Sequence, residues 1–337
     1  MKIPPGLDVC SASSSAPLVC KLKKSLYGLR QASRQWFSKL SEALLSRGYI
    51  SSLNDYSLFT KFSSGSLVVM AVYVDDILLA GDDLAEMQSL TSFLDDQFKI
   101  KDLGSVHYFL GLEISKTPQG YVMSQHKYTS DLLAEFKCNH FSAVLTPLDP
   151  PVKLTMDMGD PLPDPSLYRR LIGKLNFLQH IRPDISFSVQ HLSQFLQKPH
   201  VPHMMAGLHV LRYLLAAPSQ GVLLSNSPDL SLIAYSDSDW ASWAISRKSV
   251  TAEYRALRKV TAEVSWLVIL LGDLGLHVGS PVPVHCDSQA ALHIAKNSVF
   301  HERTKHIEID CHYVRECLNS GLSLYILFLV LTSWLIL

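Results

Sequence analysis

Apolar and polar positions recur with two different periods along this chain, and these periods predict where helices and strands lie. The three-to-four-residue spacing of an amphipathic helix occurs in residues 28–47, 82–98, 129–136, 168–181, 185–196, 203–215, 251–274 and 288–296. Short apolar runs bounded by turn residues predict strands at 108–114, 120–123, 230–235 and 282–286. The mixture of elements predicts an α+β fold.

Two apolar runs between residues 67 and 80 flank Asp75 and Asp76. Aspartate favours turns, so this segment predicts a β-hairpin with two carboxylates at its tip. Neighbouring strand residues point to opposite faces, and both carboxylates can reach one ion only at a turn. Carboxylates are ligands for Mg²⁺, and paired ions stabilise an in-line phosphoryl transfer. From the dipeptide alone, a plain Asp-Asp turn is the alternative.

The composition allows two ordinary domains, because the chain has 337 residues, of which 47% are hydrophobic and 18% charged. A formal net charge of zero argues against a dedicated nucleic-acid-binding protein. Locally, however, residues 9–41 contain no acidic residue and hold a strip of basic ones, which includes Lys23, Lys24, Arg30 and Arg34. Such a strip can neutralise phosphates, although a solvated helix face is an equal alternative.

The six cysteines form no CxxC pair and are interpreted as reduced thiols of an intracellular protein, in cytoplasm or nucleus. The N-terminal residues show no signal-peptide pattern. Residues 322–337 are almost wholly apolar, which makes them a borderline tail anchor for a membrane. The alternatives are a buried strand or helix, or residues read after a frame change.

Four segments carry a family resemblance: SLYGLRQASRQW at 25–36, YVDDILLAG at 73–81, YFLGLEI at 108–114 and RPDI at 182–185. In this order they resemble the reverse transcriptase of copia-type LTR retrotransposon Pol polyproteins. The resemblance implies that Asp75 and Asp76 are palm metal ligands, that Tyr73 lies near the primer end, and that 108–114 is the primer-grip region. It places Gly28 and Gln31 where the family positions template and incoming nucleotide. The family's third palm carboxylate would precede Lys2, so we expect this site to lack a main ligand.

A second set of carboxylates comprises Asp237, at the end of an apolar run, Asp287, at the end of the next strand, and Glu253, on the helix between them. Aspartates at strand ends with a helical glutamate suit a metal site that hydrolyses a phosphodiester. Isolated strand-end and helix-surface acids are the alternative. Together with HERTKHIEIDCHYVR at 301–315, they resemble the RNase H domain of the same polyproteins, which implies catalytic and metal-binding roles for all three. The histidines and cysteine of 301–312 fit no common structural zinc site.

The chain departs from this RNase H pattern in two places. Only Ser238–Ala252 separates Asp237 from Glu253, too few residues for two further strands of about five residues each with their turns. We therefore expect a sheet that has lost two strands and exposes an apolar edge. After 318–321 the chain no longer follows the family, and no acidic residue follows Glu316.

These observations predict four regions: a partial reverse transcriptase at 1–146, a linker and helical connection at 147–229, a truncated RNase H-like α/β domain at 230–318 and an apolar, out-of-family tail at 319–337. The resemblance implies a remnant that acts on RNA template, DNA primer and RNA–DNA hybrid with Mg²⁺ or Mn²⁺, and the missing ligands predict defective catalysis. The alternatives are a non-catalytic nucleic-acid-binding relic, a slice of an intact active polyprotein, and a tail-anchored membrane form.

Overall fold

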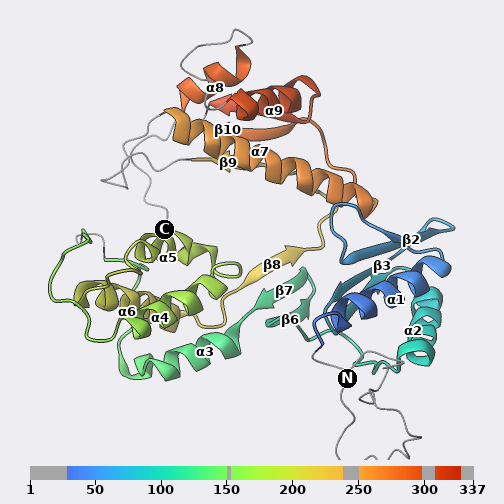
Figure 1. Cartoon of the computed structure of the whole chain (residues 1–337), viewed down its shortest axis with the longest axis horizontal. Coiled ribbons are helices and arrows are strands. Elements are labelled where there is room, and N and C mark those ends of the chain that lie inside the picture. The colour runs from blue at the N-terminus through green and yellow to red at the C-terminus, as the bar shows by residue number, and fades with distance from the viewer. Residues whose placement is uncertain (1–28, 150–152, 238–249, 298–307, 328–337) are drawn as a thin grey trace, which may run out of the picture. The chain divides into compact units, whose positions relative to one another are not determined.

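The computed structural model of this chain describes residues 29–149, 153–237, 250–297 and 308–327. It divides into two compact units, one drawn from the chain up to residue 100 and from residue 230 onward, the other from residues 101–229. Helices and antiparallel as well as parallel strands occur in them (Figure 1), so the predicted α+β class is confirmed.

The first sheet of the first unit is antiparallel, with the strand order β1-β2-β3-β4. Its elements are α1 (Ala32–Ser46), β1 (Ile50–Ser51), β2 (Leu58–Ser63), β3 (Ser66–Tyr73), β4 (Asp76–Gly81) and α2 (Leu84–Phe98). Val68, Met70 and Val72 alternate along β3 and are buried in one core with the apolar residues of α1 and α2. Both helices therefore cover the same face of the sheet. Asp83 caps α2 by accepting a hydrogen bond from the Glu86 backbone N–H at 2.9 Å.

The second sheet of this unit is parallel, with the order β11-β10-β9. Its elements are β9 (Ala234–Ser236), α7 (Val250–Asp273), β10 (Val282–Cys286), α8 (Gln289–Lys296), α9 (Glu308–Asn319) and β11 (Ser323–Leu327). Val284 and Cys286 of β10 share a buried core with residues from all three helices and with Tyr325 of β11. All four cysteines in the described part of the chain are buried.

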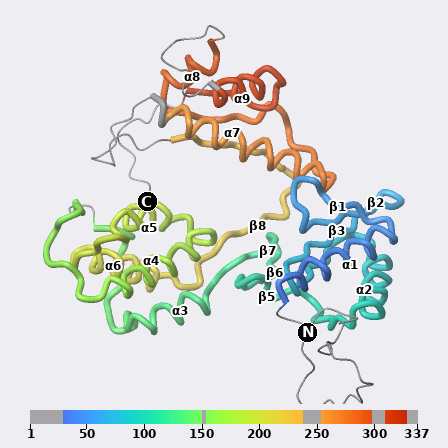
Figure 2. Tube along the Cα trace, viewed as in Figure 1, coloured from blue at the N-terminus to red at the C-terminus, as the bar shows by residue number. Residues whose placement is uncertain are grey.

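The second unit combines a small antiparallel sheet, β5-β6-β7-β8, with a helical group. Its elements are β5 (Tyr108–Phe109), β6 (Leu112–Thr117), β7 (Gly120–Ser124), α3 (His126–Glu135), η1 (Cys138–His140), α4 (Pro165–Leu178), η2 (Pro183–Ile185), α5 (Ser186–Ser193), α6 (Val201–Ala216) and β8 (Val222–Ser225). The helices bury one apolar core. Figure 2 shows the chain leaving the sheet after β7, passing through the helices and returning as β8, which pairs with β7.

Two strand predictions need correction, and part of the apolar tail forms a strand. The run 108–114 is not one strand, because Leu110 and Gly111 both have positive φ (50° and 83°) and turn the chain back between β5 and β6. The run 230–235 is a strand only at Ala234–Ser236. Ser323–Leu327, in the region expected to be an out-of-family tail, forms β11 against β10, so the buried-strand alternative describes these residues.

Residues 328–337 of the apolar tail lie outside the described part. Within the described residues, no helix is long and apolar enough to cross a membrane.

Residues 153–160, in the region predicted as a linker and helical connection, pack on the N-terminal end of α6 through two buried histidines. His203, which is fully buried, contacts Thr155 O through Nε2 at 2.9 Å and accepts the His200 backbone N–H through Nδ1 at 2.9 Å. His200 contacts Gly159 O through Nδ1 at 2.8 Å. Since Nδ1 of His203 is an acceptor, Nε2 carries the proton, and a second proton would break the contact with His200.

Burial lowers the pKa of His203 below its ordinary value of 6.5, and His200 and His191 lower it further. As pH falls below about 6.5, the unfolded chain therefore takes up this proton before the folded one, and stability is lost. We expect the opening free energy of the α4–α6 amides, measured by hydrogen exchange corrected for its intrinsic pH dependence, to be lower at pH 5.5 than at pH 7.5.

His203→Gln should lower the free energy of unfolding at pH 7.5 by roughly 1–3 kcal/mol, because packing is lost, but should flatten its pH dependence. His126→Gln, at an exposed position, is the matched control and should keep the wild-type pH dependence. An unchanged slope in His203→Gln would show that another group is responsible.

Candidate active sites and family

The paired aspartates lie at the tip of the β3–β4 hairpin, as predicted. Tyr73 pairs with Asp76 across the two strands, so Val74 and Asp75 form a two-residue turn. Both aspartates are exposed, and Tyr73 beside them is 57% exposed. The hairpin can therefore present two hard oxygen ligands and an aromatic ring to a bound molecule.

Val74 at this tip has φ 52°, in the left-handed region. A β-branched residue is an outlier there, and the first position of such a hairpin turn usually favours glycine. The side chain is 65% exposed and so gains little from burial. Strained residues of this kind cluster at functional sites. Residue type alone did not indicate this strain.

The basic strip is described only in part. Lys23, Lys24 and Gly28 lie outside the described residues. Arg30 and Arg34 are exposed around the start of α1, and Gln31 is exposed at its N-cap position. Two guanidinium groups are thus free to reach phosphate oxygens from one end of this helix.

The second carboxylate set is brought together by the parallel sheet. Ser236 of β9 pairs with Cys286 of β10, so Asp237 and Asp287 follow the carboxyl ends of adjacent strands. Glu253 lies in the first turn of α7 and is 9% exposed. Its Oε2 atom has no hydrogen-bond partner among the described residues. Burial raises the pKa of Glu253 to about 7, and the charges of Asp287 and Asp237 contribute to this rise. Glu253 therefore lies close enough to both aspartates for their charges to act on it.

Neither set forms a complete metal centre in the part of the chain that the structure describes. No group of three or more histidine, cysteine or acidic side chains there is arranged to hold a metal ion. At the hairpin, Asp75 and Asp76 supply hard oxygen donors of the kind Mg²⁺ prefers, but a two-metal centre needs further ligands. The residues present thus fit part of such a site and not the whole.

The parallel sheet is described here only in part. That part contains three strands, and β9, at one edge, is only three residues long. Residues 238–249, which follow Asp237, lie outside the description. The exposed side chains of Ile233 and Tyr235 lie in and beside this edge strand.

Comparison with known proteins identifies the family. The model of the family "Reverse transcriptase (RNA-dependent DNA polymerase)" matches residues 1–150, which include the hairpin. The retrovirus-related Pol polyprotein from transposon RE1 of Arabidopsis thaliana is 39% identical over 330 residues, covering 90% of this chain. An uncharacterized mitochondrial protein of Arabidopsis thaliana is 34% identical, over 58% of this chain and 93% of its own length. The chain belongs to the reverse transcriptase family of copia-type transposon Pol polyproteins.

The chain spans only part of the polyproteins that it matches. It covers 22% of the RE1 polyprotein and 26% of the Pol polyprotein from transposon TNT 1-94 of Nicotiana tabacum, to which it is 33% identical. No solved structure matches the chain. The matched family segment contains Tyr73, Asp75 and Asp76, whereas Asp237, Glu253 and Asp287 lie beyond it.

The strained turn gives a stability prediction. Val74→Gly should raise the free energy of unfolding by roughly 0.5–1 kcal/mol, because relief of the positive-φ strain exceeds the entropy cost of glycine. Val69→Gly, at a half-buried position in the middle of β3, is the control and should be destabilising. Urea unfolding measures both, and an equal loss of stability in the two variants would show that Val74 is not strained.

Proposed function

We propose that this chain is a remnant of a retrotransposon RNA-directed DNA polymerase and ribonuclease H that, on its own, is catalytically defective. The observation that carries the proposal is the hairpin tip, where Asp75 and Asp76 stand without a third metal-binding side chain among the described residues. Two ions that flank a transferred phosphoryl group need more protein oxygen ligands than two adjacent carboxylates provide.

The substrates we propose are RNA template, DNA primer and RNA–DNA hybrid, with Mg²⁺ or Mn²⁺ as the ion. Asp75 and Asp76 would hold the ion, which would neutralise charge on the phosphates. Tyr73 would lie against the primer end, and Gly28 and Gln31 along the template and incoming nucleotide. Backbone phosphates would be neutralised by the basic side chains of Lys23, Lys24, Arg30 and Arg34. Such contacts do not depend on the base sequence, so they give affinity without sequence preference.

For the second site we propose that Asp237, Glu253 and Asp287 descend from an RNase H centre whose cleavage of hybrids is impaired. The parallel register supports the descent, because it sets two aspartates side by side with a helical glutamate near them. The short edge strand β9 supports the impairment, because it leaves Asp237 on the least supported strand of the sheet.

A non-catalytic nucleic-acid-binding role is the second candidate. It is favoured by the acid-free segment at 9–41 and by the exposure of Arg30 and Arg34. Electrostatic attraction between basic side chains and phosphates does not require a metal site. Binding can therefore persist after a catalytic metal ligand is lost. A further alternative is that the missing ligands belong to a longer polyprotein, which full-length sequencing of the transcript would reveal as one continuous reading frame.

The 337-residue protein should show no Mg²⁺-dependent primer extension above the enzyme-free background on an RNA template with a DNA primer. The reason is the incomplete ligand set at the hairpin. Asp75→Asn should give the same background, and Asp96→Asn, an exposed acid on α2, serves as the matched control. Extension by the wild type that disappears in Asp75→Asn and persists in Asp96→Asn would contradict the proposal.

The same protein should bind an RNA–DNA hybrid in a strongly salt-dependent way. If about four basic side chains contact phosphates, affinity should fall roughly a hundredfold between 50 and 200 mM salt, and the double substitution Lys23→Ala/Lys24→Ala should reduce the log–log slope by about 2. The control pair Lys116→Ala/Lys259→Ala removes two exposed lysines elsewhere and should leave the slope unchanged.

The hybrid in this assay should stay intact in Mg²⁺. Salt-independent binding would exclude the binding role, and cleavage that Asp287→Asn abolishes would show an active RNase H centre.

A further inference from the structure

The parallel sheet of the first unit has two faces, and the described helices cover only one of them. Val284 of β10 and Tyr325 of β11 lie on the covered face, where they share a buried core with residues of α7, α8 and α9. The three helices also contact one another, so they lie together on this side. Parallel sheets occur almost only with both faces covered. The second face therefore lacks its usual cover in the part of the chain that the structure describes.

The second face, called the open face below, is formed by alternate residues of the three strands. Its members are Ile233 (directly before β9), Tyr235, Pro283, His285, Leu324 and Ile326. His285 pairs with Tyr235 on one side and with Ile326 on the other, and directly opposite residues lie on the same face. The rings of Tyr235 and His285 are stacked, with centroids 5.1 Å apart. The open face is thus one continuous surface across the sheet.

This surface is apolar and accessible. Tyr235 is 63% exposed, Ile233 56% and Leu324 45%, and the other three members are half-buried. No member of the open face is an acid, a lysine or an arginine. Contiguous exposed apolar residues of this kind mark an interaction site more often than an ordinary surface. The open face therefore fits an occupant that is itself apolar and uncharged.

The chain carries such an occupant next to this face. The tail segment, residues 328–337 (FLVLTSWLIL), directly follows β11; eight of its ten residues are apolar and none is charged. β11 is an outer strand of the sheet, so β9 on the other side is two strand spacings away, about 10 Å. Ten residues span about 15 Å as an α-helix and about 33 Å as an extended strand. The tail segment is therefore long enough to cross the open face.

A membrane is a poorer partner for the tail segment. A helix needs about 20 apolar residues to cross the hydrocarbon core of a bilayer. Ser323–Leu327, in the apolar stretch 322–337, are already paired with β10, and Tyr325 is buried there. The ten residues that follow are about half of the required length.

A second copy of the chain is also a poorer occupant of the open face. A segment of another molecule must be bound from dilute solution. The tail segment is joined directly to β11, which gives it an effective concentration in roughly the millimolar range.

We propose that the tail segment folds back over the open face of its own sheet and buries Ile233, Tyr235 and Leu324. It would supply the second cover that a parallel sheet needs. The inference concerns the packing of this chain alone and requires neither polymerase nor nuclease activity.

Trp334 in the tail segment allows a direct test in the full-length protein. Its emission is the difference between the wild type and Trp334→Phe. Acrylamide should quench this emission at least about threefold less than it quenches N-acetyltryptophanamide, because docking excludes water and quencher from the ring. Tyr235→Asp, which places a charge on the open face, should restore quenching close to that of the free compound. Ile309→Asp, at an exposed apolar position on α9, is the matched control and should leave Trp334 shielded.

A second measurement reports from the sheet and does not alter it. Hydroxyl-radical oxidation of Tyr235 should rise about threefold when the tail segment carries Leu331→Asp/Leu335→Asp, because the charged tail no longer covers the ring. Thr332→Ala/Ser333→Ala is the matched control in the same segment and should leave this oxidation unchanged. Tyr121, an exposed tyrosine of the second unit, is the internal reference.

Several outcomes would overturn the proposal. One is quenching of wild-type Trp334 equal to that of the free compound, and another is shielding that persists in Tyr235→Asp. A third is oxidation of Tyr235 that the charged tail does not change. Shielding that requires phosphatidylcholine vesicles would show that the tail segment enters a membrane instead. Shielding that is lost on about a hundredfold dilution would show that it docks on a second copy.

Discussion

Burial of one apolar face on each sheet of the first unit fixes where the strands end. The acidic side chains of both candidate sites lie at or near those ends. In β3, Val68, Met70 and Val72 enter the core formed with α1 and α2. A shift by one residue would turn all three toward the opposite face, so the register cannot slip. The tip of the hairpin is thereby set at Val74 and Asp75. In the parallel sheet, Val284 and Cys286 have the same role, and Asp287 follows them into solvent.

The two carboxylate sets differ in their surroundings, although both lie at strand ends. Asp75 and Asp76 are exposed, so water screens their charges and the pair is tolerated without a partner. Glu253 is buried close to two further acids, where like charges repel more strongly. With a pKa of about 7, it takes up a proton near neutral pH, which relieves that repulsion. The charges of the two sites are therefore balanced in different ways: solvent screens Asp75 and Asp76, whereas protonation reduces the charge of Glu253.

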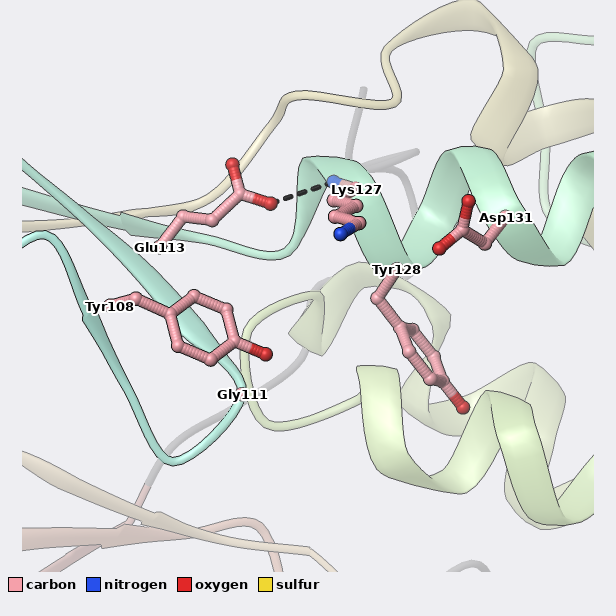
Figure 3. Close-up of a pocket in the computed structure, with 6 residues that line it drawn as sticks. All are labelled: Tyr108, Gly111, Glu113, Lys127, Tyr128 and Asp131. Carbon is pink, nitrogen blue, oxygen red and sulfur yellow. Dashed lines mark hydrogen bonds between the residues drawn. The ribbon is translucent and has the colours of Figure 1, made fainter. Parts of the chain in front are cut away.

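Much of the fold was predictable where local pattern and tertiary packing agree. The hairpin at 67–80, the long helix α7 and strand β10 all follow from periodicity and turn residues. The break between β5 and β6 was missed, because Leu110 adopts a positive φ that its residue type does not indicate. β8 was missed as well, because its partner β7 is remote in sequence. Glu113 accepts the Lys127 backbone N–H in the first turn of α3 (Figure 3). The sequence shows that α3 lacks a short polar residue at its N-cap, but not which distant side chain replaces it. The burial of Glu253 depends on packing that no local pattern records.

The return of β8 to β7 has a consequence for biosynthesis. β5, β6 and β7 leave the ribosome well before β8, since all the helices of the second unit are translated in between. During that interval the backbone N–H and C=O groups along one side of β7 have no strand beside them. Such long-range pairing raises contact order and slows folding. The nascent chain therefore has an unpaired strand edge until the helices have been synthesised and folded. Binding of a chaperone to this edge, or pairing with a neighbouring nascent chain, is most favourable at this stage.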